Sequence, residues 1–490
     1  MNIFGKLSKI TISFLILAEL FSLIAYLLPP LNQVAFFAIL GVALVLVLLK
    51  QEYGLYLILA ELFIGGFGHL FSFSVYDFSI SIRMALFALV LSVWLIRQIL
   101  NFKLSIPKIP ILYYLFFLIL IGGVINGLWH NALTAVFFDA NAWVYFILIF
   151  IFFDLIKNKE IVDDILQILV GSTAYLALKT IGILILFAQG ITGIGGFFYK
   201  WLRDSGAGEV TYVSGSIFRV FLQSQIYCLI GLAIVLVILL AGYKKFDKKV
   251  LVFTIGYLYL TSLALIISQS RSYWVGAVAA LFLILIFSWW QFGFRIKKTI
   301  TLVAVLVIMV LSQLLLIQIM TGNFTGNIIA NRFGNLKSEP AGISRLNQLP
   351  PLLFNIEQQA IFGYGFGKQL TYVSQDPRIV KNHPGGIYTT YAFEWGYLDI
   401  ALKVGVIGLL VYLALIVQMF YQEFRRIRNY ELRIMNNKEF QIPNSYFLIP
   451  GLLAGLLALG VTNIFSPYLN HPLGITYLLL ASVIINQYDR

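Results

Sequence analysis

An arginine set among serine residues is the sharpest chemical feature of the sequence. Arg271 lies in the segment SQSRSYWVGA (268–277), directly where a long apolar run begins. An anion at this position would meet the guanidinium group, the serine hydroxyls and the positive end of a helix together. Arginine also donates paired hydrogen bonds that match the oxygens of a phosphate. The segment therefore predicts a phosphate site, although the ordinary alternative is an arginine that snorkels to a lipid–water boundary.

Two candidate proton acceptors stand in the polar region that follows. Glu394 precedes an apolar run, and in a partly apolar site it could serve as a general base. The alternative is a surface carboxylate near the start of a helix. His383, in the segment NHPGG (382–386), is the second candidate base, and its alternative is a loop histidine before a proline turn. The sequence leaves the choice of base open between these two residues.

Aromatic side chains are frequent in the same region and could stack against sugar rings. Their alternative role is an aromatic belt at a membrane interface. The short motif GYGFG (363–367) has neither the glycine spacing nor the strand–helix context of a nucleotide site. The aromatic candidates are Tyr364, Phe366, Tyr372, Tyr388, Tyr391, Phe393 and Trp395.

Metal and disulfide chemistry find little support in the sequence. Cys228 is the single cysteine and lies in an apolar run, so neither a disulfide within the chain nor a cysteine metal site is expected. No HExxH motif or paired spacing connects the four histidines, which are His69, His130, His383 and His471. We therefore expect no metal and no cofactor.

The composition places these residues in a membrane protein. The chain has 490 residues, of which 60% are hydrophobic and only 11% are charged. Continuous apolar runs of about 20 residues recur along it, and such runs are long enough to cross the hydrocarbon layer as helices. We predict an all-α polytopic membrane fold with about 14 transmembrane helices and no soluble catalytic domain. The predicted helices span residues 10–28, 32–49, 53–70, 83–100, 109–126, 134–156, 162–189, 218–241, 250–268, 273–292, 298–320, 397–420, 445–462 and 473–487.

Basic residues set the predicted orientation in the membrane. The clusters KKFDKK (244–249) and FRRIRNYELR (424–433) fall on one side, which the positive-inside rule assigns to the cytoplasm together with both termini. The net charge of +13 is then explained by topology rather than by nucleic-acid binding. Cations that gather on the outer side run against this trend and suggest a shared anionic ligand. These cations are Arg83, Arg219, Arg271, Lys403 and, deeper in the membrane, Lys179.

The predicted orientation also defines the domain organisation. The large external loop contains Arg345 and lies between the eleventh and twelfth predicted helices. A loop of this length at a membrane surface is more often functional than not. We expect N-terminal transmembrane helices in 1–190, an external loop in 191–217, transmembrane helices with the SQSR motif in 218–320, the large external loop in 321–396 and C-terminal transmembrane helices in 397–490.

Several of these features together resemble one family. SQSR opening a helix, Arg345 in the following loop, FGYGFG (362–367) and EWGYLDIALKVGVIG (394–408) are similar to the O-antigen ligase/polymerase superfamily. Members of this superfamily are bacterial membrane glycosyltransferases of the metal-independent GT-C class. The resemblance covers roughly residues 210–420. It implies transfer of an oligosaccharide from undecaprenyl pyrophosphate on the outer face of the bacterial cytoplasmic (inner) membrane.

The resemblance also implies roles for single residues. Arg271 and Arg345 match the family's phosphate-binding arginines, and Arg219 fits a third such position. Tyr397 matches the tyrosine of the ligase pattern H-N-x-Y-L and is expected to contact substrate. Glu394 stands where that pattern has histidine, and this departure favours a polymerase over a ligase.

Three functions are therefore compared. The favoured one is an O-antigen-like polysaccharide polymerase, and the first alternative is a ligase-type transferase that moves glycan to lipid A core or to a protein. The second alternative is a polysaccharide flippase or transporter, which should carry charges through a central cavity and lack a large outer loop. The expected partners are the lipid-linked glycan donor, the glycan acceptor, membrane lipids, and a polysaccharide chain-length regulator or a flippase. No nucleic-acid partner is expected.

Overall fold

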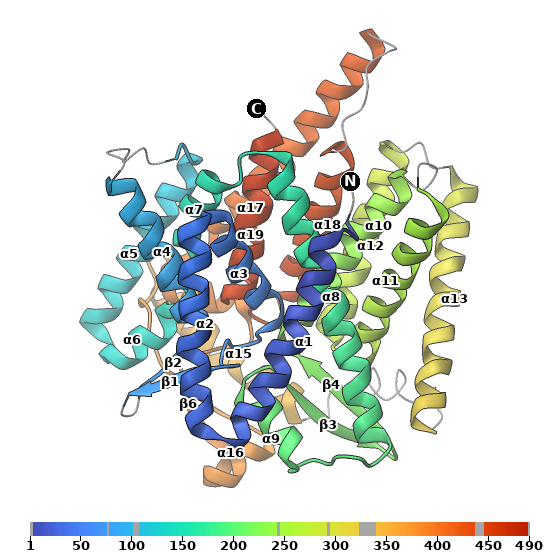
Figure 1. Cartoon of the computed structure of the whole chain (residues 1–490). Helices are drawn as coiled ribbons and strands as arrows, with labels where there is room; N and C mark the ends of the chain where they lie inside the picture. The colour runs from blue at the N-terminus through green and yellow to red at the C-terminus, as the bar shows by residue number, and fades with distance from the viewer. Residues whose placement is uncertain are drawn as a thin grey trace. The chain divides into compact units, whose positions relative to one another are not determined.

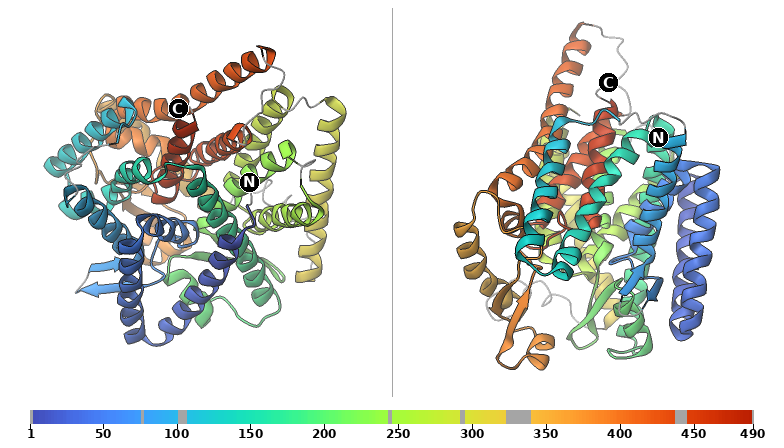
Figure 2. Two further views of the ribbon diagram at one scale, coloured as in Figure 1. Left: turned by 45° about the horizontal axis from the view of Figure 1, so that its top comes forward. Right: turned by 90° about the vertical axis from the view of Figure 1, so that its left-hand side faces the viewer.

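The computed structural model confirms the predicted all-α class. It describes residues 3–75, 78–100, 107–242, 246–291, 295–322, 340–436 and 445–488. Residues 323–339 of the predicted large loop, and Lys244 and Lys245 of the first basic cluster, lie outside the described residues. Figure 1 and Figure 2 show the helices and strands of the chain, coloured by residue number. The chain divides into two compact units, each of which is described by itself below.

The first unit comprises Met1–Pro107, Ile151–Gly326 and Gln441–Ala458. Its helices are α1 (Lys6–Leu27), α2 (Pro29–Leu49), α3 (Gln51–Ile64), α4 (Ile82–Leu100), α8 (Lys159–Ala188), α9 (Phe197–Asp204), η2 (Gln223–Gln225), α10 (Ile226–Gly242), α11 (Lys248–Ile267), α12 (Arg271–Trp290) and α13 (Ile296–Thr321). Its strands are β1 (Ser72–Val75), β2 (Phe78–Ser81), β3 (Gly208–Ser214) and β4 (Ile217–Leu222).

The second unit comprises Lys108–Phe150, Asn327–Phe440 and Leu459–Arg490. Its elements are α5 (Ile111–His130), α6 (Leu133–Ala140), η1 (Asn141–Ile147), α15 (Pro340–Gln358), β5 (Leu370–Val373), α16 (Pro377–Asn382), η4 (Pro384–Gly386), β6 (Ile387–Thr390), α17 (Gly396–Asn436) and α19 (Pro472–Tyr488). Two further helices, α7 (Leu148–Leu155) and α18 (Ser445–Thr462), have residues in both units.

Helix α8 forms the centre of the first unit. The Asn158 side chain caps it by accepting a hydrogen bond from the Ile161 amide at 3.0 Å. The helix packs against α1, α3, α10 and α11, and most of its residues are buried. At Gly171 a methyl group would lie 2.6 Å from the Ser8 carbonyl oxygen, so glycine allows α1 to approach closely.

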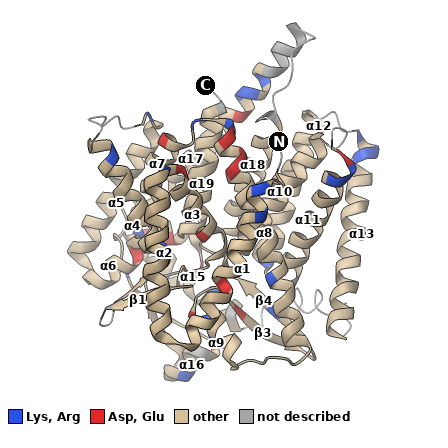
Figure 3. Cartoon of the chain, in the orientation of Figure 1, with Lys and Arg blue, Asp and Glu red and all other residues tan. Residues whose placement is uncertain are grey.

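Long apolar helices confirm the membrane class. The described part of the chain contains 11 helices that are long and apolar enough to cross a membrane, and two shorter apolar helices, Phe447–Thr462 and Pro472–Gln487. Helix α13 has the smallest buried share of these 11 helices, because only 11% of its most apolar stretch is buried inside the protein. Its basic residues, like those of α11, lie in the first turn (Figure 3). The chain is a multi-pass membrane protein, while the number of about 14 spans stays a prediction.

The sequence does not predict the three two-stranded antiparallel hairpins of the described residues, β1–β2, β3–β4 and β5–β6. The predicted helix start at residue 218 is wrong, because β4 occupies this position and α10 begins only at Ile226. The β-branched and aromatic residues of IFRVFL (217–222) favour a strand, in which Val220 pairs with Val210. Only the short polar segment η2 (Gln223–Gln225) separates this strand from α10, and hydropathy averaged over about 19 residues merges the two.

The predicted helix over 53–70 is also too long. Helix α3 has 14 residues and ends at Ile64. The chain then turns through Gly66 and Gly68, whose φ angles of +55° and +87° are costly for any residue with a side chain. The glycine turn therefore ends the helix, although the apolar residues continue beyond it.

Helix α17 of the second unit is broken at Gly405, where φ is 72° and ψ is 176°. A break in a helix leaves backbone carbonyls without their usual partners. Here a preceding loop supplies the donors: the Tyr364 amide donates to the Leu402 carbonyl at 2.8 Å, and the Gly365 amide donates to the Lys403 carbonyl at 2.9 Å. The GYGFG motif is thus a loop that completes a broken helix.

The same loop also contacts α5. Gly365 has a φ of +79°, and a methyl group there would lie 2.2 Å from the Gly127 nitrogen. The Asn131 side-chain amide donates to the Phe366 carbonyl at 3.0 Å. The loop 363–367 is therefore held between the backbones of α5 and α17.

Candidate functional site

Arg345 and Glu394 form an ion pair in the second unit. Arg345 lies on α15, and Glu394 lies in the loop directly before α17. The Arg345 Nε donates a hydrogen bond to Glu394 Oε2. The two side chains are 35% and 41% exposed, so a ligand can reach both. The structure thus brings together a predicted phosphate-binding arginine and a predicted base that are 49 positions apart in the sequence.

Helix α15 also fixes the backbone around the base. The Glu394 amide donates to Gln348 Oε1 at 3.1 Å, and the Trp395 indole donates to the Arg345 carbonyl at 2.8 Å. Because Arg345 and Gln348 are three residues apart, they share one face of α15. Two hydrogen bonds to α15 therefore hold the loop that carries the Glu394 carboxylate.

The β5–β6 hairpin adds a row of aromatic rings. Its register places Tyr372 opposite Tyr388, with ring centroids 6.0 Å apart and ring planes at 86°. The ring of His383 packs against Tyr388 at 5.8 Å. Partial burial raises the pKa of Tyr372, and the nearby charge of Glu394 contributes to this shift. The rings of Tyr372 and Tyr388 therefore lie between Glu394 and His383.

His383 itself is an exposed residue that follows α16. Its amide donates to the Ile379 carbonyl at 2.8 Å, and Pro384 begins the short helix η4. This is the arrangement of a loop histidine before a proline turn. The structure pairs Arg345 with Glu394, and it packs the ring of His383 against Tyr388 in an edge-to-face contact.

In the first unit, the turn between α11 and α12 carries the SQSR motif. Arg271 is the first residue of α12, as predicted for a helix start. The hydroxyls of Ser270 and Ser272 share a hydrogen bond of 3.1 Å. Gln269 has a φ of +47°, which is uncommon for a residue other than glycine. Backbone of this kind is often found at functional sites.

Arg219 contacts this turn from β4. Its Nε donates to the Ser268 carbonyl at 2.9 Å, and its guanidinium carbon lies 5.0 Å from the centre of the Phe221 ring. The structure therefore places Arg219 beside the segment of Arg271. That Arg271 and Arg345 act on one ligand stays a prediction, since these two residues belong to different units.

Comparison with known proteins identifies the segment that holds most of these residues. Residues 256–413 match the family model described as O-antigen ligase. Over these residues the chain is similar to the O-antigen ligase/polymerase superfamily. No curated protein matches it. The segment matched to O-antigen ligase contains Arg271, Arg345, His383, Glu394 and Tyr397, and Arg219 precedes it.

Tyr397 lies in the first turn of α17, within the segment matched to O-antigen ligase. Its hydroxyl donates to the Gly460 carbonyl at 2.7 Å. This contact anchors the first turn of α17 and already occupies the hydroxyl proton. A role of Tyr397 at the substrate stays a prediction.

Most of the cations expected to share an anionic ligand have carboxylate partners in this protein. Arg83 Nε lies 2.7 Å from Glu61 Oε2, and Lys179 Nζ lies 2.7 Å from Glu19 Oε1. Their side chains are between 4% and 10% exposed. Buried charges are costly unless they are paired. These two cations are therefore neutralised by internal carboxylates and are not available to bind an anionic ligand. Lys403 is likewise paired with buried carboxylates and is not available to bind an anionic ligand.

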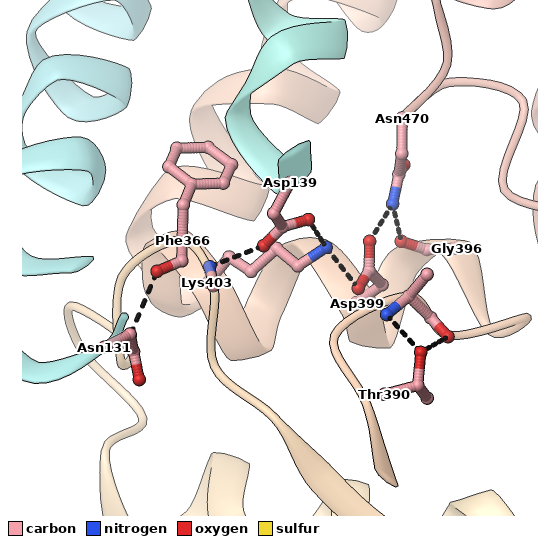
Figure 4. A network of polar contacts seen from close by, with 10 residues as sticks. Asn131, Asp139, Phe366, Thr390, Gly396, Asp399, Lys403 and Asn470 are labelled. Carbon is pink, nitrogen blue, oxygen red and sulfur yellow. Dashed lines mark hydrogen bonds and ion pairs between the residues drawn. The ribbon is translucent and has the colours of Figure 1, made fainter. Parts of the chain in front are cut away.

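Sequence reasoning missed the polar network around Lys403 (Figure 4). Its Nζ lies 2.5 Å from Asp139 Oδ1 and 2.7 Å from Asp399 Oδ1. One signal was available, because Asp399 and Lys403 are four residues apart and so share a face of a helix. Nothing in the sequence connects either residue with Asp139, which is more than 200 positions away.

Proposed function

We propose that this protein is a polysaccharide polymerase of the O-antigen ligase/polymerase superfamily. It would transfer an oligosaccharide from undecaprenyl pyrophosphate to a sugar hydroxyl on the outer face of the bacterial cytoplasmic membrane. The observation that carries the proposal is the accessible ion pair of Arg345 and Glu394 inside the segment matched to O-antigen ligase. It combines a cation suited to phosphate with a proton acceptor.

The arginines would act on the leaving group. When the bond to the lipid diphosphate breaks, negative charge develops on the phosphate oxygens. Arg345 and Arg271 would stabilise this charge through paired hydrogen bonds, which is the largest contribution open to a transferase that uses no metal. Arg219 would support the turn that carries Arg271, through its contact with the Ser268 carbonyl.

Glu394 would act on the acceptor. The acceptor hydroxyl oxygen attacks the anomeric carbon of the donor, the bond from that carbon to the phosphate oxygen breaks, and the hydroxyl proton passes to the Glu394 carboxylate. The lipid diphosphate leaves with the electron pair of the broken bond. The rings of Tyr372 and Tyr388 would provide stacking faces for the acceptor sugar, with His383 as the second candidate base.

The proposed reaction requires a defined orientation. Both termini would be cytoplasmic and the segment 321–396 would be external, so that donor and acceptor meet outside the membrane. The basic residues in the first turns of α11 and α13 support this orientation. Membrane lipids surround the protein, and a chain-length regulator or a flippase would be its protein partners.

A ligase is the second candidate, and the description of the matched family favours it. A ligase would attach one finished glycan to lipid A core or to a protein. Glu394 stands where the ligase pattern has histidine, and for this reason the polymerase is preferred. The size of the product separates the two functions, because a polymerase makes a ladder of lengths and a ligase caps each acceptor once.

The test is turnover by purified protein in lipid nanodiscs. Synthetic undecaprenyl-pyrophosphate oligosaccharide is supplied as donor and acceptor, and products are separated by length. The wild-type protein should give a ladder, and Arg345→Ala and Arg271→Ala should lower its rate by on the order of 100-fold. Lys381→Ala is the matched control, because Lys381 is an exposed cation of the same loop region and should keep full activity.

Three outcomes would contradict the proposal or part of it. A wild-type protein that forms no glycosidic product with any lipid-linked glycan would exclude the transferase. A single capped product without a ladder would replace the polymerase by the ligase. Normal product lengths and rates in Arg345→Ala would remove this arginine from the site.

A further inference from the structure

The ion cluster of the second unit consists of Lys403, Asp139 and Asp399. The side chains are between 3% and 5% exposed, so water does not screen their charges. Lys403 lies between the two carboxylates, at 2.5 Å from Asp139 and 2.7 Å from Asp399 (Figure 4). Buried charges at membrane depth are costly and persist only with close partners. The cluster therefore has one strongly preferred geometry.

One end of the ion cluster holds the GYGFG loop. Asp139 Oδ2 accepts a hydrogen bond from the Gly367 amide at 2.7 Å, while its other oxygen contacts Lys403. The Lys403 carbonyl in turn accepts from the Gly365 amide at 2.9 Å. Lys403 is thus connected to the loop through its side chain and through its backbone.

The other end of the ion cluster holds the start of α17. The Asn470 side-chain amide donates to Asp399 Oδ2 at 2.6 Å and to the Gly396 carbonyl at 3.0 Å. Figure 4 shows Asn470 directed at both groups. Glu394 is two residues before Gly396, so a shift of this first turn would move its carboxylate. The two anchors of this segment are then α15 on one side and the ion cluster on the other.

We infer that Lys403 is a positioning residue, whose ion pairs with Asp139 and Asp399 hold the first turn of α17 and thereby the Glu394 carboxylate at the reacting hydroxyl. The catalytic part of this inference rests on the proposed function. The mechanical part, that Lys403 orders the segment 390–399, does not. A misplacement of a base by about 1 Å can cost on the order of 100-fold in rate, so the effect is measurable.

The test compares Lys403→Met with the wild-type protein by hydrogen–deuterium exchange in nanodiscs. Reporter amides lie in the segment 390–399, where the Asp399 amide donates to the Trp395 carbonyl at 2.8 Å. Exchange in this segment should be about tenfold faster in the variant, because the first turn of α17 loses its anchor. Unchanged exchange in 390–399 would overturn the inference.

Lys179→Met is the matched control. It removes a lysine of similar burial from a carboxylate partner in the first unit, so any general loss of stability is common to both variants. Exchange in 390–399 should stay at the wild-type rate. Equal acceleration by Lys179→Met would mean that Lys403 has no special connection with this segment. If Lys403→Met does not fold, Asp399→Asn weakens the same cluster and should accelerate exchange in the same segment.

Activity separates this inference from the proposed function. With an active wild-type protein, Lys403→Met should lower kcat by on the order of 100-fold, and KM for the donor should change by less than about twofold. Unchanged kcat would contradict the positioning role. A wild-type protein without transferase activity would refute the proposed function alone, and the exchange experiment would still decide whether Lys403 orders the segment.

Discussion

Replacing Gly365 by alanine tests how tightly the GYGFG loop is held. The added methyl group would lie 2.2 Å from the Gly127 nitrogen, and the φ of +79° is unfavourable for alanine. The backbone term costs about 1–2 kcal/mol. Displacing a packed backbone costs about 1–3 kcal/mol more. We therefore expect Gly365→Ala to lose about 2–5 kcal/mol of unfolding free energy.

Gly385 provides a control with the same backbone angle. Its φ is also +79°, but a methyl group there would have no atom within 4 Å. Gly385→Ala should therefore lose only the backbone term of about 1–2 kcal/mol. The difference between the two variants isolates the contact between Gly365 and Gly127.

The assay is equilibrium unfolding of the two variants and the wild-type protein in mixed detergent micelles, by titration with sodium dodecyl sulfate. Tryptophan fluorescence and helix content should give coincident transitions if the comparison is to be treated as two-state. Equal losses for Gly365→Ala and Gly385→Ala would refute the reasoning. In that case the loop would yield to the methyl group, and the contacts between the loop and α5 would not be tight.

Two further predictions concern the candidate base and a buried ion pair. Glu394→Gln should lower polymer formation by about 10²–10⁴-fold, whereas His383→Gln should stay near the wild-type rate; the opposite ranking in the nanodisc assay would make His383 the base. Glu61→Gln should cost about 3–5 kcal/mol of unfolding free energy, because it leaves the buried Arg83 without its carboxylate. Glu52→Gln, which alters an ion pair of 3.9 Å to a half-exposed lysine, should cost about 0–1 kcal/mol in the same titration, and equal losses would argue against the burial effect.

Hydropathy predicts most of the helices because each run meets a single physical requirement, which is to satisfy its backbone in lipid. The predicted span 298–320 corresponds to α13, and 273–292 corresponds to α12, each within a few residues. The same reasoning fails at β4, since this strand consists mainly of apolar residues, like the helix α10 that follows it. It also fails after Ile64, where glycine conformation decides.

The residues of the candidate site were predictable as types and not as partners. Arg345 and Glu394 each stand out by their chemistry, but their contact depends on how α15 packs against the loop before α17. The pairing of Lys403 with Asp139 likewise requires a fold that joins α6 with α17. Long-range ion pairs of this kind leave little trace in one sequence, so the sequence does not distinguish the buried ion pair of Lys403 from the partly exposed ion pair of Arg345.

The contact of Arg345 with Glu394 has a consequence for the resting protein. Each group is the counter-ion of the other, so an incoming diphosphate would have to take the place of the carboxylate on the guanidinium. The displaced carboxylate would then be free to accept a hydrogen bond from an acceptor hydroxyl. Without a bound donor, the protein would keep the Glu394 carboxylate in its contact with Arg345. Binding of the lipid-linked glycan would release the carboxylate.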